Sequence, residues 1–240
     1  MRPTTRTVAP ENWLKFLAGR SRCCPSSPRK VPGSESTGSF CLTGLWPLTA
    51  AEVETLALVN VENAMIGYKK PVVGPLNFAV NPGDRLGIWG ANGSGKSTLL
   101  RYFSHSARLF SGQITLSPGT SIAYQPQQAV HPQELPLTGN EYLGLMGADS
   151  SPVPERIKPY LSKRVDLLSG GQFQILSTWA NLASNGQLVL LDEPTNNLDP
   201  DAIELLVETI LAMPPEHALI VVSHEKLFIE KVATHMLIIE

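Results

Sequence analysis

The residues most clearly suited to chemistry form one glycine-rich stretch, Gly90-Ala91-Asn92-Gly93-Ser94-Gly95-Lys96-Ser97, with Thr98 directly after it. The stretch fits the pattern G-x-x-x-x-G-K-[ST] and joins an apolar segment at 85–89 to a helix-like segment at 98–102. Glycines let successive backbone N–H groups point at one anion, and a helix N-terminus adds positive charge. We therefore expect a nucleotide-phosphate site in which Lys96 reaches the β- and γ-phosphates and Ser97 binds Mg²⁺. The alternative, a plain glycine-rich turn, is disfavoured because every position of the pattern is filled.

A second candidate is the acidic pair Asp192 and Glu193, which ends the apolar segment 188–191. Four apolar residues in a row predict a buried strand, and open α/β sheets bind ligands at the carboxyl ends of their strands. We expect Asp192 to hold the Mg²⁺ shell and Glu193 to polarise an attacking water. Alone, the pair fits a solvated loop equally well. The phosphate loop is what favours the catalytic interpretation.

Strands and helices alternate in the part of the chain that carries these residues. Strand patterns are expected near 56–61 and 76–88, with turns at Gly67 and at 81–83, and further strands near 114–116, 121–124, 187–191, 218–222 and 236–239. Helices are expected at 94–106, 169–183, 200–213 and 225–232. Alternation of helices with solidly apolar strands indicates an α/β fold with a parallel sheet covered on both faces.

The segment Leu168-Ser169-Gly170-Gly171-Gln172 lies about twenty residues before the strand that ends at Asp192. It is the signature of ABC ATPases, and the chain resembles that family from about Leu56 to its end. The resemblance implies a P-loop NTPase core with a mainly parallel sheet, an N-terminal antiparallel β subdomain, and a short helical subdomain at about 128–167. It also implies ATP and Mg²⁺ as ligands and hydrolysis of ATP to ADP and phosphate.

In the family, the signature contacts the γ-phosphate of an ATP bound by a second ABC domain. The implied donors to this phosphate are Ser169 and the amides of Gly170 and Gly171, and Gln172 closes the motif. They lie at a helix start, which favours an anion. Two ATP molecules are thereby held between two domains that face head to tail. The implied partner is a second ABC domain, either another copy of the chain or a missing N-terminal half.

Two further positions take roles from the resemblance. Tyr68, twenty-eight residues before Lys96, matches the aromatic residue that stacks on adenine; a tyrosine in a turn between strands is the alternative. Gln127 matches the glutamine that senses Mg²⁺ and the attacking water. Gln125 and Gln128 lie close enough to leave the register open.

The C-terminal part supplies two more matches. His224 follows the apolar strand at 219–222 and matches the histidine that contacts the γ-phosphate. An unremarkable histidine at a strand end is the alternative, and the spacing disfavours it. Asp199, in Asn197-Leu198-Asp199, matches the loop that communicates across the dimer.

The amino-acid sequence around these motifs is similar to that of the ABC-F group, in the segments 82–100, 192–199 and 223–228. That branch implies a cytoplasmic protein that acts on ribosomes or confers antibiotic resistance. The short interval between Gln127 and Leu168 disfavours docking onto a membrane subunit, but the ATPase subunit of a transporter stays an alternative. An ATP-binding fragment without turnover is the other alternative, because ABC-F proteins carry two ABC domains and this chain carries one.

The composition of the chain disfavours several other classes of protein. A net charge of −2 gives no bulk attraction to nucleic acid or anionic membranes. The 3 cysteines lie within the first 41 residues, which disfavours a disulfide-stapled secreted fold. No apolar run approaches the ~20 residues that span a bilayer.

Residues 1–55 differ in kind from residues 56–240. The first fifty hold seven Lys and Arg against two Asp and Glu, and 24–44 is dominated by Pro, Ser, Thr and Gly. We interpret 1–55 as a disordered or artefactual leader, with an organellar transit peptide as the alternative. The ABC ATPase domain is expected at 56–240.

Overall fold

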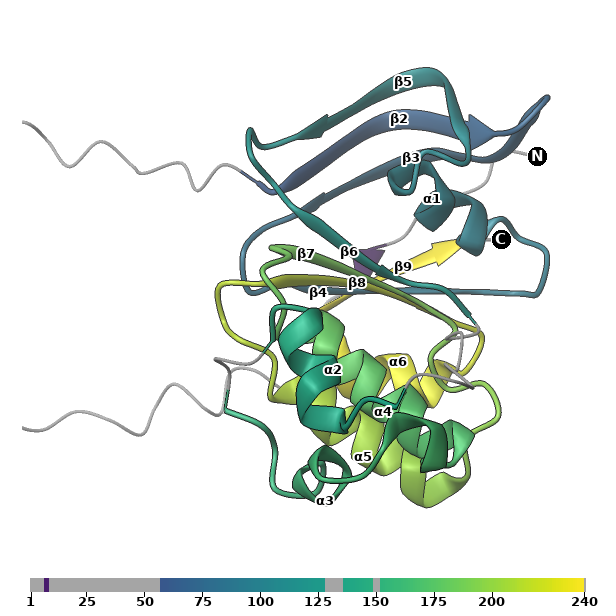
Figure 1. Cartoon of the computed structure of the whole chain (residues 1–240). Coiled ribbons are helices and arrows are strands. Elements are labelled where there is room, and N and C mark those ends of the chain that lie inside the picture. Colours follow the sequence, from purple (N-terminus) through teal and green to yellow (C-terminus); the bar gives the residue numbers. More distant parts are fainter. Residues whose placement is uncertain (1–6, 9–56, 128–135, 149–151, 240) are drawn as a thin grey trace, which may run out of the picture. The chain divides into compact units, whose positions relative to one another are not determined.

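The computed structural model describes residues 7–8, 57–127, 136–148 and 152–239 (Figure 1). The chain divides into two units, one of residues 1–10 and 56–240 and one of residues 11–55, and the second lies outside the described residues. The strands of the first unit are β1 (Thr7–Val8), β2 (Val59–Gly67), β3 (Pro71–Val80), β4 (Arg85–Gly90), β5 (Arg108–Leu116), β6 (Ile122–Gln125), β7 (Leu188–Asp192), β8 (Ala218–Ser223) and β9 (His235–Ile239). The helices are α1 (Lys96–Phe103), α2 (Gly139–Leu145), α3 (Lys158–Leu161), the 3₁₀ helix η2 (Val165–Leu167), α4 (Gly170–Leu182), α5 (Pro200–Leu211) and α6 (Lys226–Val232).

A six-stranded sheet in the order β1-β9-β4-β8-β7-β6 forms the centre of this unit. β9, β4, β8, β7 and β6 are parallel, and β1 pairs antiparallel with β9. All residues of β7 and β8 are buried, as their apolar sequences predict. Helices α4, α5 and α6 lie on one side of this sheet, while α1 and the second sheet lie on the other (Figure 1). The carboxyl ends of β4, β7 and β8 therefore lie side by side, where the motif residues follow.

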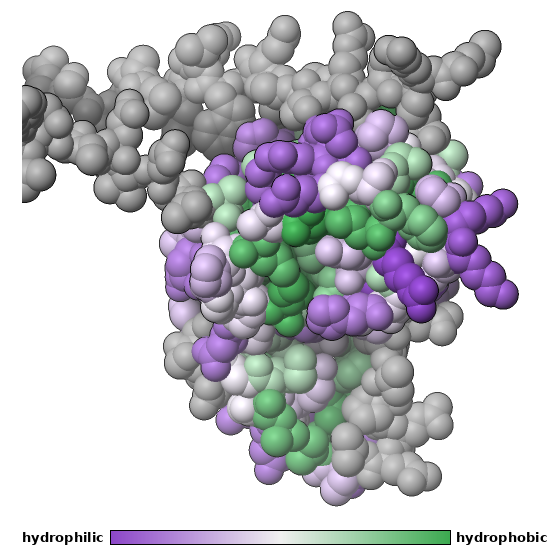
Figure 2. Space-filling view, turned by 90° about the horizontal axis from the view of Figure 1, so that it is seen from above, coloured by the Kyte–Doolittle hydropathy of each residue, from purple (hydrophilic) through white to green (hydrophobic). Residues whose placement is uncertain are grey.

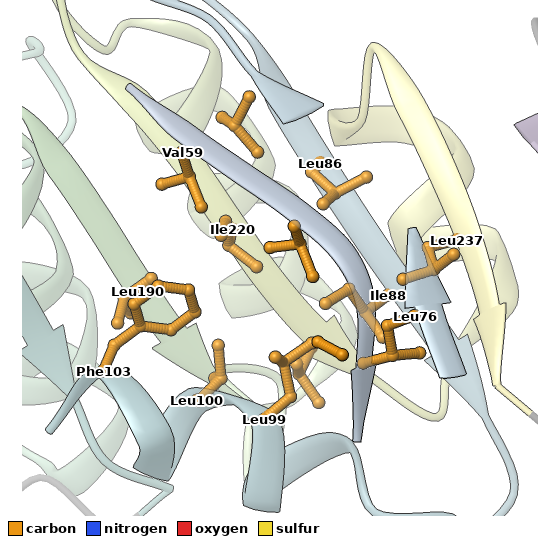
Figure 3. Close-up of a cluster of buried hydrophobic side chains, with 14 of the residues drawn as sticks. Val59, Leu76, Leu86, Ile88, Leu99, Leu100, Phe103, Leu190, Ile220 and Leu237 are labelled. Atoms are coloured by element: carbon orange, nitrogen blue, oxygen red, sulfur yellow. The ribbon is translucent and has the colours of Figure 1, made fainter. Parts of the chain in front are cut away.

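The second sheet is antiparallel, in the order β3-β2-β5. Its inner face adds Val59 and Leu76 to a core with Leu99 and Phe103 of α1 and Leu190 of β7 (Figure 3). Its outer face is mixed, with apolar side chains between polar ones in the view from above (Figure 2). The antiparallel sheet thus packs α1, and with it the end of the phosphate loop, against the main sheet.

The helical part packs as a separate cluster around Trp179 of α4, with Leu143 of α2 and Ile157 among its buried members. Thr138 begins α2 with a capping box to Glu141, which fixes the start of this short helix. The expected subdomain at 128–167 thus contains α2, α3 and η2, while residues 128–135 and 149–151 lie outside the described residues.

The α/β class, the parallel sheet and the antiparallel β subdomain are confirmed. The strand expected at 114–116 was predicted too short, because β5 pairs with β2 from Arg108 onward. The interpretation of residues 1–55 as a leader falls almost wholly outside the described residues, apart from β1. In the described part of the chain, no helix has the length and apolar character needed to cross a membrane.

Candidate functional site

The glycine-rich loop lies where β4 ends and α1 begins, and its neighbours fix its conformation. Gly95 has φ 96°, and a Cβ placed there would lie 2.7 Å from Cβ of Val73. A Cβ on Gly90 would lie 2.2 Å from the carbonyl oxygen of Ile239. Both glycines are therefore required by the packing around the loop as well as by its curl.

Lys96 is almost fully buried, with 5% of its surface exposed. Its ammonium donates to the carbonyl oxygens of Gly90 at 2.9 Å and Ala91 at 3.0 Å. Oε1 of Glu193 lies 3.7 Å from the same nitrogen. The loop thus holds one positive charge at its centre, beside a carboxylate from the next-but-one strand.

Ser97 and Asp192 form a pair of oxygen donors. The Ser97 hydroxyl donates to Oδ1 of Asp192 at 2.8 Å, and the Tyr124 hydroxyl donates to Oδ2 at 3.4 Å. Burial raises the pKa of Asp192, and the bond from Ser97 opposes that shift. Hard cations such as Mg²⁺ prefer hydroxyl and carboxylate oxygens, so this pair fits the ion. Among the described residues, no group of three or more His, Cys, Asp and Glu is placed to hold a metal ion, so phosphate and water oxygens would have to complete the shell.

Glu193 follows Asp192 in a left-handed conformation, with φ 48°. This turn sends its buried carboxylate toward His224, the residue after β8. Oε2 of Glu193 accepts from the backbone N–H of His224 at 3.2 Å and lies 2.7 Å from Nδ1 of its ring. A non-glycine residue at positive φ is strained, so the contacts around Glu193 must hold the turn in this conformation.

One cavity of about 280 Å³ has Lys96, Ser97, Thr98, Glu193 and Gln127 in its lining. Asp192 and His224 are not part of the lining and adjoin it through their contacts with Ser97 and Glu193. The cavity has polar groups on several sides and opens to solvent. A triphosphate at its floor would meet the loop amides, the ammonium and the oxygen pair together.

The structure also bears on the glutamine left open by the sequence. Gln125 is the last residue of β6, pairs with Leu191 of β7 and is 2% exposed. Its side-chain nitrogen and oxygen have no hydrogen-bond partner among the described residues. Gln127 lies beyond the strand and lines the cavity, and Gln128 lies outside the described residues.

Tyr68 does not line the phosphate cavity. It lines a neighbouring hollow of about 540 Å³ with Lys69, Arg108 and Phe110, and 39% of its surface is exposed. Arg101 of α1 donates to its hydroxyl at 3.3 Å. Tyr68 is thereby linked to the helix that follows the phosphate loop, at a position open enough to receive a planar ring.

The signature lies apart from the phosphate loop. Ser169 begins α4 with a capping box: its hydroxyl accepts from Gln172 N–H at 3.2 Å, and Oε1 of Gln172 accepts from Ser169 N–H at 3.2 Å. Ser169 and Gly170 are exposed, and Gly171 is half-buried. Ser169, Gly171, Gln172 and Asp199 line a cavity of about 220 Å³. Among the described residues, this cavity and the phosphate cavity share no lining residue.

Asp199 has a structural contact of its own. It begins α5, and its Oδ1 accepts from the backbone N–H of Ala202 at 2.8 Å. The loop at 197–199 therefore leads from the Glu193 turn to the edge of the signature cavity. One chain brings Lys96, Ser97, Asp192, Glu193, His224 and Gln127 together and leaves Ser169 elsewhere.

Two contacts of the site escaped the sequence. Tyr124 bonds Asp192, and the indole of Trp89 donates to the carbonyl oxygen of His224 at 3.0 Å. In the sequence, the signal for Tyr124 was its place next to Gln125, at the end of the strand expected at 121–124. For Trp89, the only signal was a large aromatic residue directly before the first glycine of the loop.

Comparison with known proteins gives consistent results. The model of the family described as ABC transporter matches residues 73–196. The zinc import ATP-binding protein ZnuC of Paracoccus denitrificans is 33% identical over 171 residues, covering 68% of this chain and 67% of ZnuC. The energy-dependent translational throttle protein EttA of Haemophilus influenzae is 30% identical over 203 residues, covering 75% of this chain but 34% of EttA. An ATP-binding cassette of an ABC transporter in its ADP conformation has the same fold, with a TM-score of 0.61 at 19% identity, over 77% of this chain and 88% of the cassette.

Proposed function

We propose that this chain, which belongs to the ABC transporter family of ATP-hydrolysing P-loop enzymes, works as one half of a head-to-tail pair of ABC domains that ATP draws together. One observation carries the proposal: the phosphate cavity and the signature cavity are separate and open in the same chain. A γ-phosphate on Lys96 has no contact with Ser169 of its own chain. A second domain supplies that contact.

In this proposal the site works mainly by positioning and by neutralising charge. The loop amides and Lys96 bind the phosphates, while Ser97 and Asp192, with Gln127 at the rim, hold Mg²⁺. The ion supplies charge neutralisation on the β- and γ-phosphates when it is bound. Tyr68 stacks against the adenine, in the hollow beside α1.

Glu193 is the proposed base, because its carboxylate lies in the cavity next to Lys96. It orients a water for in-line attack and takes its proton, while His224 contacts the γ-phosphate. The 2.7 Å contact between Nδ1 of His224 and Oε2 of Glu193 keeps both groups at the same end of the cavity. Closure on ATP and opening after hydrolysis are the mechanical output.

We place the chain with the ABC-F group, as a cytoplasmic protein that acts on ribosomes or in antibiotic resistance. Support comes from the similarity to EttA and from the short helical part, in which α2 has 7 residues and α3 has 4. Because the chain covers only 34% of EttA, its proper partner in this proposal is a first ABC domain outside the present sequence.

A transporter ATPase is the second candidate, and a specific observation favours it. The match to ZnuC covers 68% of this chain and 67% of ZnuC, about two thirds of each. A membrane-embedded transporter subunit is then the partner. Co-sedimentation with ribosomes in the presence of ATP supports the first candidate, and co-purification with a detergent-solubilised membrane subunit supports the second.

The pairing itself is tested with Ser169→Arg, which places a long cation at the signature face and leaves the phosphate loop intact. We expect this variant to bind ATP normally, to hydrolyse it poorly and to elute as a monomer. Glu193→Gln with ATP should elute as a dimer, and the specific activity of the unchanged protein should rise with its concentration. Hydrolysis by a strict monomer, independent of concentration, would overturn the proposal.

A further inference from the structure

Trp89 is a residue of β4, and its indole lies against the loop that carries His224. It is the residue directly before Gly90, and its indole Nε1 donates to the carbonyl oxygen of His224 at 3.0 Å. The ammonium of Lys226, at the start of α6, lies 6.0 Å from the centre of the ring. Two elements that lie far apart in the chain, the end of β4 and the start of α6, are thus joined through one side chain.

The position of Trp89 on its strand explains this contact. Ile88 points into the core shared with α1 (Figure 3), and neighbouring side chains of a strand point to opposite faces. Trp89 therefore lies on the α6 face of the sheet, as does Gly87, where a Cβ would lie 2.4 Å from Cγ2 of Ile229. In the parallel register Trp89 is paired with Ser223, the residue before His224.

The loop that Trp89 contacts is short. Only His224 and Glu225 separate the end of β8 from the start of α6. Glu225 makes no side-chain cap for α6, and its backbone N–H donates to the Ser223 hydroxyl at 3.1 Å. The His224 carbonyl is fixed from the outside by the indole, while the His224 ring contacts Glu193 on the inside at 2.7 Å.

We propose that Trp89 is a positioning residue for hydrolysis, which fastens the His224 loop to the strand entering the phosphate loop and so sets the His224 ring against Glu193 and the γ-phosphate. The ammonium of Lys226 steadies the ring by a cation–π contact. This inference rests on the proposed role of His224. It adds to that role a connection between Trp89, which directly precedes the phosphate loop, and His224, which contacts the γ-phosphate in the proposed function.

The test is a double-mutant cycle of Trp89→Phe with His224→Ala, measured as kcat and KM for ATP. Phenylalanine keeps an aromatic ring at this position and removes the N–H donor, together with part of the ring surface. We expect kcat to fall about fivefold, the size of one neutral hydrogen bond, with KM within twofold. The backbone carbonyl of residue 224 survives in His224→Ala, so any purely structural effect of losing the bond is the same in both backgrounds. If Trp89 acts through the His224 ring, Trp89→Phe lowers the residual kcat of His224→Ala no further.

Lys226→Gln provides a second variant, with about a twofold fall in kcat expected from the lost cation–π contact. Lys231→Gln, at the other end of α6, is the matched control and should leave kcat unchanged. An equal loss from Trp89→Phe in both backgrounds would overturn the inference, as would an unchanged kcat in Trp89→Phe. If instead His224→Ala itself hydrolyses ATP at the normal rate, the proposed function is what fails.

Discussion

Lys96→Ala tests the assignment of the phosphate loop most directly. Lys96 is the only side-chain cation within the loop sequence 90–97. Its ammonium makes two hydrogen bonds, to the carbonyls of Gly90 and Ala91. The substitution therefore removes a buried charge that is held ready for an anion.

The size of the effect follows from these contacts. ATP exchanges the two carbonyl acceptors of Lys96 for phosphate oxygens, so the affinity gained is a difference and is smaller than two full ionic bonds. A net hydrogen bond to a charged group contributes about 1.5–3 kcal/mol, which corresponds to about 10- to 150-fold in affinity. We therefore expect ATP to bind to Lys96→Ala about 10- to 150-fold more weakly.

Isothermal titration with ATP and Mg²⁺ measures this affinity, and a thermal melt without nucleotide checks that the variant is folded. Lys96→Gln keeps a donor on a side chain one atom shorter but not the charge, and should bind nearly as weakly. Lys231→Ala, an exposed lysine of α6, is the control for lost charge elsewhere. A folded Lys96→Ala protein with affinity within twofold of the unchanged protein would refute the assignment of the site.

Three other predictions follow from the same geometry. Glu193→Gln should keep ATP binding and lose about 10²- to 10⁴-fold in phosphate release, the range of a general base; rapid turnover would move the base elsewhere. Gly95→Ala should lower the free energy of unfolding by about 2–4 kcal/mol in a nucleotide-free melt, because Val73 adds a clash to the strain of positive φ. Gly93→Ala, where no described atom lies within 4 Å of the added Cβ, should show the strain alone. Deleting residues 1–50 should leave ATP affinity unchanged, since every described residue that lines the phosphate cavity lies at 72 or beyond; a folded truncation that loses affinity would contradict this.

Much of the site could be predicted because its parts are contiguous in the sequence. The loop 90–97 must present consecutive amides, and Asp192 and Glu193 must follow one buried strand. Such requirements leave a local pattern of residue types. The fold class followed in the same way, because β7 and β8 are apolar up to their last residues and a helix, α5, separates them.

The parts that the sequence left open depend on pairing at long range. From the sequence alone, Gln125, Gln127 and Gln128 are equivalent candidates. Because β6 ends with Gln125 paired to Leu191, Gln125 is buried and Gln127 lies at the cavity. β5 extends to Arg108 because β2 offers partners along its whole length. Most residues of β5 are exposed, and its apolar residues do not alternate regularly with polar ones, so no strong period marks the whole strand. Trp89 and His224 are 135 positions apart, and no local pattern links them.

The contacts within one chain also explain why hydrolysis should need a partner. Lys96 is occupied by two loop carbonyls and has Glu193 at 3.7 Å, while Glu193 is held by His224. The Ser169 hydroxyl is engaged in the capping box of α4. ATP alone can draw Lys96 to the phosphates, because a triphosphate is a stronger acceptor than a carbonyl. It cannot bring up the signature, which lies in another cavity. We therefore expect binding to be a property of the single chain, and hydrolysis to be a property of the pair.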